Sequence, residues 1–325
     1  MIARSDLEKQ LSSTLFEVSL SGFGQKIPGK VRDSFVVGDK RILVTSDRLS
    51  AFDRILTTIP FKGALLNTMA AFWFEQTRHI VRNHIVAHPH PNVFIARQVK
   101  IIPIEVVVRG FLAGSAWRDY QTGNPVSGIA LPAGLKKSHR FEKPLLTPST
   151  KAEHGKHDEP ISSAEVVKRG IVSEKVWNVV AEKALALFAH GTKVAKERGL
   201  LLVDTKYEFG TITLPNGELE VVLADEIHTQ DSSRYWVADS YQQRFERDED
   251  PEMLDKEFFR RWLIERGYMG DGTPPEIPDN IRLDLAEKYM EVCEKMTGKS
   301  FSAAMGSPIP GIVAALEGAR REGLV

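Results

Sequence analysis

The stretch LLLVDTKYEFG, residues 200–210, and the stretch ELEVVLADE, residues 218–226, decide the fold. Both are rich in β-forming residues, and a Pro-Asn-Gly turn at 215–217 lies between them. Two such runs joined by a short turn predict an antiparallel hairpin. Residues 31–46, VRDSFVVGDKRILVTS, predict a second hairpin around Gly38-Asp39-Lys40.

Further elements surround these hairpins. Residues 93–109 have β character, and Pro103 is expected to break one strand from the next. Ser173 is typical of a helix N-cap, and the chain after about residue 251 is helical, with Asp279 as a cap of one helix. Strands thus come first and helices last, which predicts an α+β fold rather than regular βαβ alternation.

Length and charge limit the class of protein. The 325 residues suggest about two domains. Lys and Arg number 43 and balance 43 Asp and Glu, so binding of nucleic acid or of anionic membrane by bulk charge is not expected. Cys293, the single cysteine, excludes an intramolecular disulfide and favours a reducing compartment. With no signal peptide or membrane anchor recognised, we expect a soluble cytoplasmic protein.

The strand at 200–210 carries the strongest chemical signal. Side chains alternate faces along a strand, so Asp204, Lys206 and Glu208 share one face, here called the polar row. Pairing of the two hairpin arms would bring Asp225 near it. Carboxylates around one lysine suit Mg²⁺ together with a phosphate. A solvated strand face with incidental ion pairs has the same pattern, and the spacing leaves both interpretations open.

Arginines and small residues form a second signal. Arg109 ends an apolar strand, Ser115 follows in Ala-Gly-Ser, and Arg234 follows two serines. Guanidinium forks and hydroxyl donors suit phosphate, although a surface arginine after a strand is equally common. The segment 29–33, GKVRD, sets two cations beside a glycine, but neither the P-loop nor the dinucleotide fingerprint is present.

A long segment, residues 121–163, has many prolines and glycines and little periodicity. Such a segment inside a compact domain is typical of a lid or binding loop, or of a disordered region. We expect a lid.

Taken together, the motifs resemble those of the SAICAR synthetase family, in the longer form with a C-terminal helical extension. The two signature segments are IIPIEVVVRGFLAGS at 101–115 and LLVDTKYEFG at 201–210. The other matching segments, in chain order, are GKVRD (29–33), SDRLSAFD (46–53), PFKGALLN (60–67), TPSTKAEHGKHDE (147–159) and LADEIHTQDSSRYW (223–236).

The resemblance implies a two-lobed α+β fold with a nucleotide site like those of kinases and ATP-grasp enzymes. An antiparallel N-terminal nucleotide-binding lobe would cover residues 1–105. A mixed substrate-binding lobe, with the long segment and the helical tail, would cover residues 106–325. The implied reaction joins L-aspartate to the carboxylate of carboxyaminoimidazole ribotide (CAIR) and cleaves ATP to ADP and phosphate. ATP and Mg²⁺ are the implied co-substrate and metal, and a monomer or small homo-oligomer is expected.

The family's site roles are carried over to matching positions of this chain. The implied ATP-binding residues are Lys30, Arg32, Lys100 and Glu105. The implied metal ligands are Glu208 and Asp225, and the implied catalytic residues are Lys151, Asp158 and Lys206. The implied substrate-binding residues are Ser46, Asp47, Ser50, Asp53, Arg109, Ser115, Asp204, Lys206 and Arg234. A related enzyme acting on another acid or amine, and a non-catalytic nucleotide-binding protein, remain as alternatives.

Overall fold

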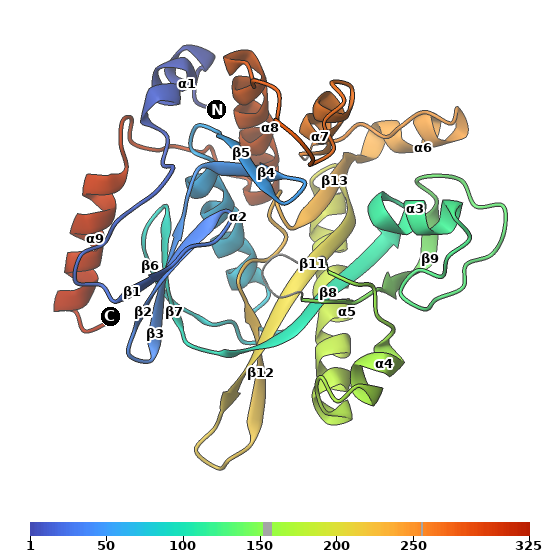
Figure 1. The fold of residues 1–325 in the computed structure, drawn as a ribbon, viewed down its shortest axis with the longest axis horizontal. Helices are drawn as coiled ribbons and strands as arrows, with labels where there is room; N and C mark the ends of the chain where they lie inside the picture. The colour runs from blue at the N-terminus through green and yellow to red at the C-terminus, as the bar shows by residue number, and fades with distance from the viewer. Residues whose placement is uncertain (152–157, 255) are drawn as a thin grey trace. The chain divides into compact units, whose positions relative to one another are not determined.

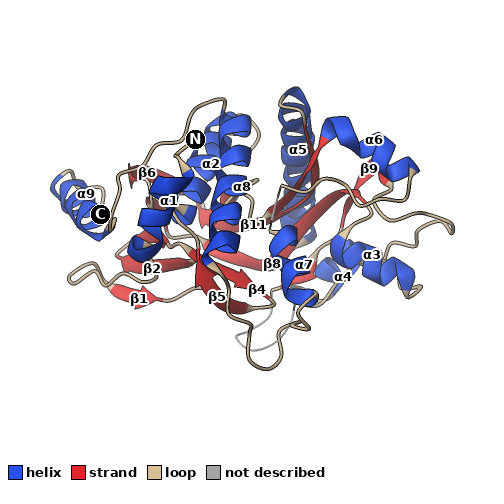
Figure 2. Cartoon of the chain, turned by 90° about the horizontal axis from the view of Figure 1, so that it is seen from above, coloured by secondary structure: helices blue, strands red, loops and turns tan. Residues whose placement is uncertain are grey.

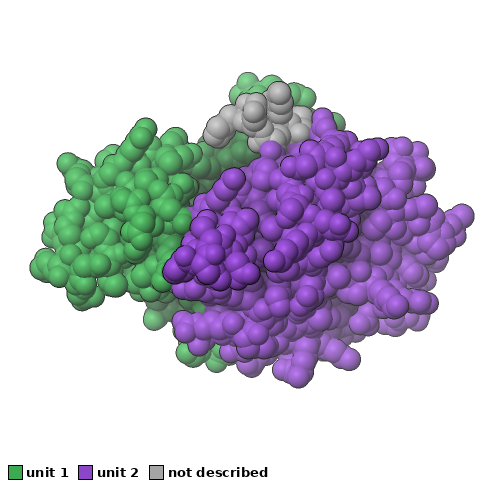
Figure 3. Space-filling model, turned by 90° about the horizontal axis from the view of Figure 1, so that it is seen from below, with its two compact units in different colours: residues 1–72, 84–98, 254–325 green, residues 73–83, 99–253 purple. Residues whose placement is uncertain are grey.

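The structure is a computed structural model that describes residues 1–151, 158–254 and 256–325. The chain forms two compact units, which Figure 3 shows in different colours. Unit 1 comprises residues 1–72, 84–98 and 254–325, and unit 2 comprises residues 73–83 and 99–253. By compactness the helical tail therefore belongs with the N-terminal strands. The functional division into 1–105 and 106–325 stays a prediction.

Unit 1 contains a five-stranded antiparallel sheet in the order β1-β2-β3-β7-β6 and a separate β4-β5 hairpin. The predicted hairpin at 31–46 is confirmed as β2 and β3. The strands are β1 (Gln25–Ile27), β2 (Arg32–Val37), β3 (Lys40–Thr45), β4 (Arg48–Ala51), β5 (Arg54–Thr58), β6 (Ile85–His90) and β7 (Val93–Arg97).

Helices complete unit 1. They are α1 (Arg4–Gln10), the 3₁₀ turn η1 (Leu11–Ser13), most of α2 (Lys62–Gln76), α7 (Glu257–Ile264), α8 (Asp279–Thr297) and α9 (Ile309–Arg321). A buried stripe along α8 packs into one apolar core, and Cys293 is 1% exposed within it, as expected of a small buried residue. The cap predicted at Asp279 is wrong, because Pro278 occupies the N-cap and Asp279 is the first helical residue.

Unit 2 is built on a six-stranded antiparallel sheet, whose central strand β11 (Leu200–Thr213) pairs along one edge with β8 (Lys100–Phe111). Along its other edge β11 pairs first with β13 (Ser233–Val237) and then with β12 (Leu219–Ala224), so the predicted hairpin at 200–226 is confirmed. Two short strands, β9 (Arg140–Leu146) and β10 (Ser149–Thr150), pair with β8.

Two sequence expectations about unit 2 need correction. Pro103 does not end a strand, because β8 continues through it. The β8–β11 register shifts between Glu208 and Gly210, so Pro103 lies at an irregularity where a missing ladder N–H costs little. The segment 121–163 is also more regular than expected, since it contains β9 and β10. Residues 152–157 of that segment lie outside the described residues.

The helices of unit 2 are α3 (Gly114–Gln121), α4 (Ser163–Lys168), α5 (Glu174–Glu197) and α6 (Ala238–Glu246). Ser173 caps α5 as predicted, since its side chain accepts a hydrogen bond from the Val176 N–H. The long α5 packs against β11 and β8 (Figures 1 and 2), which leaves the opposite face of these strands for polar side chains. Among the described residues, no helix is long and apolar enough to span a membrane.

Candidate functional site

The polar row lies on β11, the central strand of unit 2, and strand alternation separates it from the core. Val203, Thr205, Tyr207 and Phe209 are all at most 1% exposed on the other side of the strand. The polar row side chains take the remaining positions, as the alternation predicts. In the antiparallel register Arg109 pairs with Asp204 and Glu105 pairs with Glu208, so side chains from β8 extend the row sideways.

Two arginines converge on Asp204 at one end of the row. The Asp204 carboxylate accepts from Arg109 at 3.2 Å and from Arg234 at 2.6 Å, and Arg234 lies directly opposite it on β13. Arg109 is 8% exposed, and its two other nitrogens donate to the hydroxyls of Thr147 and Ser115, each at 2.9 Å. A buried guanidinium held on three sides presents a fixed positive charge.

Carboxylates and lysines gather at the other end. The Lys206 Nζ lies 2.5 Å from Glu105 Oε1 and 3.8 Å from Glu208 Oε1. The Lys151 Nζ lies 2.5 Å from the other oxygen of Glu208, so one carboxylate bridges two lysines. Glu208 lies four positions after Asp204 along the strand, which places the two about 13 Å apart. The row therefore has an arginine end and a lysine–carboxylate end.

The charged groups at the lysine–carboxylate end shift each other's pKa values. Burial lowers the pKa of Lys206, but the charges of Glu105, Glu208 and Asp225 outweigh burial and raise it above the ordinary lysine value. Burial raises the pKa of Glu105, and the negative charges of Asp158 and Glu208 add to this against the pull of Lys206. Asp158 and Asp225 therefore act on the same group of charges, although they come from distant parts of the sequence.

This concentration of carboxylates has the chemistry of a magnesium site. Mg²⁺ prefers hard oxygen ligands and is usually held by one or two carboxylates together with phosphates and water. Glu208 and Asp225 supply such oxygens, because Glu208 pairs with Ala224 in the β11–β12 register and Asp225 follows. Within residues 1–151, 158–254 and 256–325, no three metal-binding side chains form a ready cage. The donor set therefore fits a metal that arrives with substrate phosphates.

The segment after β12 is fixed by residues that the sequence analysis did not single out. Asp225 and His228 have φ values of 61° and 51°, in the left-handed region that non-glycine residues rarely adopt. His228 is fully buried, where its Nε2 lies 2.6 Å from the Tyr207 hydroxyl and its carbonyl accepts from the Tyr235 hydroxyl at 2.8 Å. Burial lowers the pKa of His228 to about 3, so the imidazole is neutral. These contacts tie the Asp225 segment to β11 through Tyr207 and to β13 through Tyr235.

The predicted residues of unit 1 form a separate group. The Lys30 Nζ pairs with Asp53 at 2.6 Å, and both side chains are exposed. Asp53 lies in the β4–β5 turn, where it has a positive φ of 62°. Arg32, at the start of β2, donates to the Thr45 hydroxyl at 2.9 Å. The glycine-flanked segment and the turn thus place two cations and a carboxylate on unit 1.

Ser46 and Asp47 have structural partners in unit 1. The Ser46 hydroxyl donates to the Val31 carbonyl at 2.5 Å. Asp47 is 3% exposed, and its two oxygens accept from the backbone N–H groups of Leu15 at 2.7 Å and Gly63 at 2.8 Å. Burial raises the pKa of Asp47 to about 6, although both hydrogen bonds oppose the rise. These contacts show that both residues hold backbone.

Two other predicted residues have simpler surroundings. Ser50 is half-buried on β4, opposite Ile55. Lys100 is exposed at the start of β8, opposite Thr211. Their assigned binding roles stay predictions.

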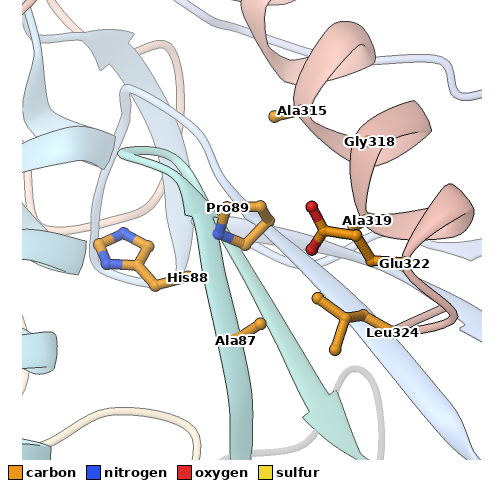
Figure 4. A pocket seen from close by; sticks show the side chains of 8 residues that line it. All are labelled: Ala87, His88, Pro89, Ala315, Gly318, Ala319, Glu322 and Leu324. Atoms are coloured by element: carbon orange, nitrogen blue, oxygen red, sulfur yellow. The ribbon is translucent and has the colours of Figure 1, made fainter.

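A pocket of about 340 Å³ opens between β6 and α9 in unit 1 (Figure 4). Small side chains line most of it, with His88 and Glu322 as the polar members. None of the residues predicted from the sequence is among them. The lining residues are Ala87, His88, Pro89, Ala315, Gly318, Ala319, Glu322 and Leu324.

Comparisons with known proteins find relatives that match most of the chain. A phosphoribosylaminoimidazole-succinocarboxamide synthase of Legionella pneumophila is 47% identical over 293 residues, which cover 88% of this chain and 92% of the relative. A solved SAICAR synthase from Saccharomyces cerevisiae, complexed with SAICAR, matches with a TM-score of 0.77 and 34% identity, covering 89% of this chain and all of that one.

A solved type-2 SAICAR synthetase in complex with ADP matches with a TM-score of 0.65 and 25% identity, covering 86% of this chain and all of that one. These neighbours confirm the predicted α+β fold of SAICAR synthase type. The sequence profile of the family described as SAICAR synthetase matches residues 25–275. With most of its length matched and its polar row assembled on the sheet, the chain belongs to the SAICAR synthetase family of enzymes.

Proposed function

We propose that the chain is an ATP-dependent carboxylate–amine ligase that joins L-aspartate to CAIR and yields SAICAR, ADP and phosphate in purine biosynthesis. The observation that carries this proposal is the two-ended row on the unit 2 sheet. Arg109 and Arg234 meet at one end, whereas Lys206 and Glu208 meet at the other. Such a row suits a substrate with a phosphate at one end and a reacting carboxylate at the other.

The chemistry of amide formation explains the need for ATP. A carboxylate resists attack by an amine because it is anionic and lacks a good leaving group. Transfer of the γ-phosphoryl group to a CAIR carboxylate oxygen gives an acyl phosphate. The aspartate amine then attacks the carbonyl carbon, and phosphate leaves with the former carboxylate oxygen. Charge neutralisation and positioning supply most of the catalysis of phosphoryl transfer.

The arginine end binds the ribotide phosphate in this proposal. Arg109 and Arg234 donate to it, and the Ser115 hydroxyl adds a neutral donor. Asp204 balances the two guanidinium groups and keeps them aligned, since it accepts from both. Thr147 orients Arg109 through its Nε.

The lysine–carboxylate end handles the reacting groups. Lys206 neutralises negative charge as the phosphoryl group moves, because its raised pKa keeps it protonated. Glu208 and Asp225 would hold Mg²⁺, which neutralises phosphate charge when bound. Lys151 exchanges its contact with Glu208 for one with substrate, and Asp158 lies near enough to act on Glu105 electrostatically.

Unit 1 supplies the nucleotide contacts in this proposal. Lys30 and Arg32 face the ATP phosphates in this proposal, and Asp53 forms an ion pair with Lys30. Ser46, Asp47, Ser50 and Asp53, also in unit 1, are assigned to substrate binding rather than to the nucleotide. Lys100 and Glu105, on β8, are assigned to ATP binding.

An acyl phosphate is hydrolysed by water, so a closing lid has a purpose. We propose that the segment 121–163 forms this lid, and its residues Lys151 and Asp158 are the ones that a substitution can test. Substitution of each by Ala should lower turnover, and unchanged turnover in both variants would remove the lid from the account. We place the enzyme in the cytoplasm. We expect a monomer or small homo-oligomer, and sedimentation of the purified chain measures this oligomeric state.

The experiment that tests the function is a coupled assay of ADP release with ATP, CAIR and L-aspartate, omitting each in turn. The ligase predicts sustained ADP release only with all three present. Equal ADP release with another acid or amine in place of CAIR or aspartate would favour the related-enzyme alternative. Nucleotide binding without any turnover would favour a scaffold.

A further inference from the structure

The side chain of Arg48, in unit 1, donates five hydrogen bonds to the segment around residues 29–33 and to Phe16. It is 4% exposed at the start of β4. Its guanidinium donates to the Gly29 carbonyl at 3.0 Å, the Lys30 carbonyl at 3.1 Å and the Phe16 carbonyl at 2.6 Å. It also donates to both oxygens of Asp33, at 2.7 and 3.4 Å. A guanidinium has five N–H donors, so these five bonds use its full capacity.

Arg48 and Ser46 together hold three successive carbonyls. Arg48 takes those of Gly29 and Lys30, and Ser46 takes that of Val31 through both its N–H at 2.9 Å and its hydroxyl. We call this arrangement the carbonyl brace. It fixes the orientation of three consecutive peptide planes in a segment that belongs to no strand.

The carbonyl brace determines where the loop N–H groups point. In a planar trans peptide the N–H is opposite to the C=O, and no cis peptide bond occurs among the described residues. Carbonyls drawn toward Ser46 and Arg48 therefore turn the N–H groups of Lys30 and Val31 away from them. Neither N–H donates a hydrogen bond within the described part of the chain. Successive N–H groups that point the same way make an anion-binding concavity.

Two further contacts show that the loop conformation is enforced. Asp33 is 2% exposed, pairs with Arg48 and accepts from the Gly29 N–H at 3.5 Å. A Cβ on Gly29 would lie 2.3 Å from the Arg32 carbonyl oxygen, so only glycine fits this fold-back. A buried ion pair contributes little net stability, but it restricts geometry when every donor is used.

We propose that Arg48 is a positioning residue for nucleotide binding. Through the carbonyl brace it directs the N–H groups of Lys30 and Val31, together with the Lys30 ammonium, toward the phosphates of ATP. Arg48 itself does not touch the nucleotide. The inference rests on the proposed function, in which this loop meets the ATP phosphates.

Arg282 offers a matched control in the same unit. It also uses its guanidinium to hold backbone, donating to the Thr58 carbonyl at 2.9 Å and the Leu11 carbonyl at 3.4 Å, and it pairs with Asp279. These partners lie in β5, η1 and α8, away in sequence from the 29–33 loop. Arg282→Lys therefore loses a comparable fork without changing the carbonyl brace.

The test is equilibrium binding of ATP, ADP and adenosine to the full chain carrying Arg48→Lys or Arg282→Lys. A lysine has three donors in place of the fork, so Arg48→Lys should weaken ATP and ADP about tenfold, the size of one charge-assisted hydrogen bond. Adenosine, which has no phosphate, should bind both variants as it binds the unaltered chain. Arg282→Lys should leave all three affinities unchanged.

The outcomes separate this inference from the proposed function. If the unaltered chain binds adenosine as tightly as ATP, the loop does not bind the phosphates. That result would also contradict the proposed nucleotide contacts. An unaltered chain that prefers ATP, with the same preference in Arg48→Lys, overturns only the role of Arg48. Equal losses in Arg48→Lys and Arg282→Lys would also overturn it, since they would indicate a general effect on unit 1.

Hydrogen exchange in the unaltered chain provides a measurement that does not depend on a variant folding. The amides of Lys30 and Val31 should exchange rapidly without nucleotide and become protected on addition of ATP. Adenosine should not protect them. Slow exchange in the absence of ATP, or no protection by it, would contradict the outward orientation of these N–H groups.

Discussion

The polar row of unit 2 and the carbonyl brace of unit 1 present charge in different ways. In unit 2 the charged side chains lie on neighbouring strands, so the ladder itself sets their spacing, as with Asp204 opposite Arg109 and Arg234. In unit 1 the exposed Lys30 lies on an irregular loop, and the buried Arg48 sets its backbone. A sheet thus positions functional groups directly, whereas a loop needs a second layer of buried groups. Mutations should therefore act on the two sites differently.

The largest effect is expected at Lys206, because its side chain itself neutralises charge during the proposed phosphoryl transfer. Lys206→Met removes the cation between Glu105 and Glu208, and turnover should fall roughly 10²–10³-fold, as when a group that stabilises developing charge is lost. The pKa of Glu105 should rise further, because its opposing cation is gone. Steady-state kinetics at saturating substrates measures the first effect, and carboxyl NMR titration measures the second.

Lys137→Met is the control for this change. Lys137 likewise pairs with a carboxylate in unit 2, that of Asp250 at 2.5 Å, but both side chains are partly exposed and lie outside the row. Exposed pairs contribute about 0–1 kcal/mol to stability, so this variant should keep normal turnover. Similar losses in both variants would show that the effect at Lys206 is not specific to the row.

The next effect concerns Asp47, which holds the backbone of Leu15 and Gly63 in unit 1, and the pH dependence of stability. Asp47 has a folded-state pKa of about 6 against 3.8 as an ordinary aspartate. A raised folded pKa means that the folded state binds the proton more tightly. The contribution to stability is therefore complete below about pH 4 and is lost as pH rises through 6, a change of about 3 kcal/mol.

Asp47→Asn cannot titrate and isolates this contribution. The difference in free energy of unfolding between the unaltered chain and the variant should change between pH 4 and pH 6.5 and level off above. Urea unfolding at four pH values in this window measures it. A difference that is constant with pH would mean that Asp47 is not desolvated in the folded protein.

A smaller effect is expected at Arg234, the more exposed of the two arginines on Asp204. Arg234→Ala removes one donor to the ribotide phosphate but leaves Arg109 and Ser115 in place. The KM for CAIR should rise about 10-fold or more, with a smaller change in kcat, since the lost contact is uniform binding. A fall in kcat with KM unchanged would place Arg234 at the reacting groups instead.

The smallest effect is expected at Thr147, which contacts Arg109 and, in the proposed function, acts on the substrate only through it. Thr147→Val removes the acceptor for the Arg109 Nε and should raise the KM for CAIR about fivefold, the value of one hydrogen bond of about 1 kcal/mol. Thr147→Ser keeps the hydroxyl and should restore the KM. Identical KM values for valine and serine would remove the positioning role of this hydroxyl.

The same contrast explains how much could be predicted from the sequence. Alternation places Asp204, Lys206 and Glu208 on one face without any structural knowledge, and the hairpin turn brings Asp225 to them. The register in which two strands that are distant in sequence pair cannot be read from either strand alone. The pairing of Lys206 with Glu105, across about a hundred residues of chain, therefore required the structure.

The loop site was less accessible to prediction. The GKVRD segment sets two cations beside a glycine, but no pattern in the sequence pairs Arg48 with Asp33. Their meeting depends on how β2 and β4 are brought together in unit 1, which no local pattern reports. Arg48 is buried at the start of a short strand, and this burial is visible only in the structure.

The most direct test of the account is the fate of the carboxylate oxygens of CAIR. With CAIR labelled by ¹⁸O at both oxygens of the reacting carboxylate, the enzyme is supplied with unlabelled ATP and L-aspartate, and the released phosphate is analysed by mass spectrometry. Transfer of the phosphoryl group to that carboxylate predicts one ¹⁸O atom in each phosphate released. Phosphate free of label, formed together with SAICAR, would contradict the acyl phosphate route and the role given to the polar row.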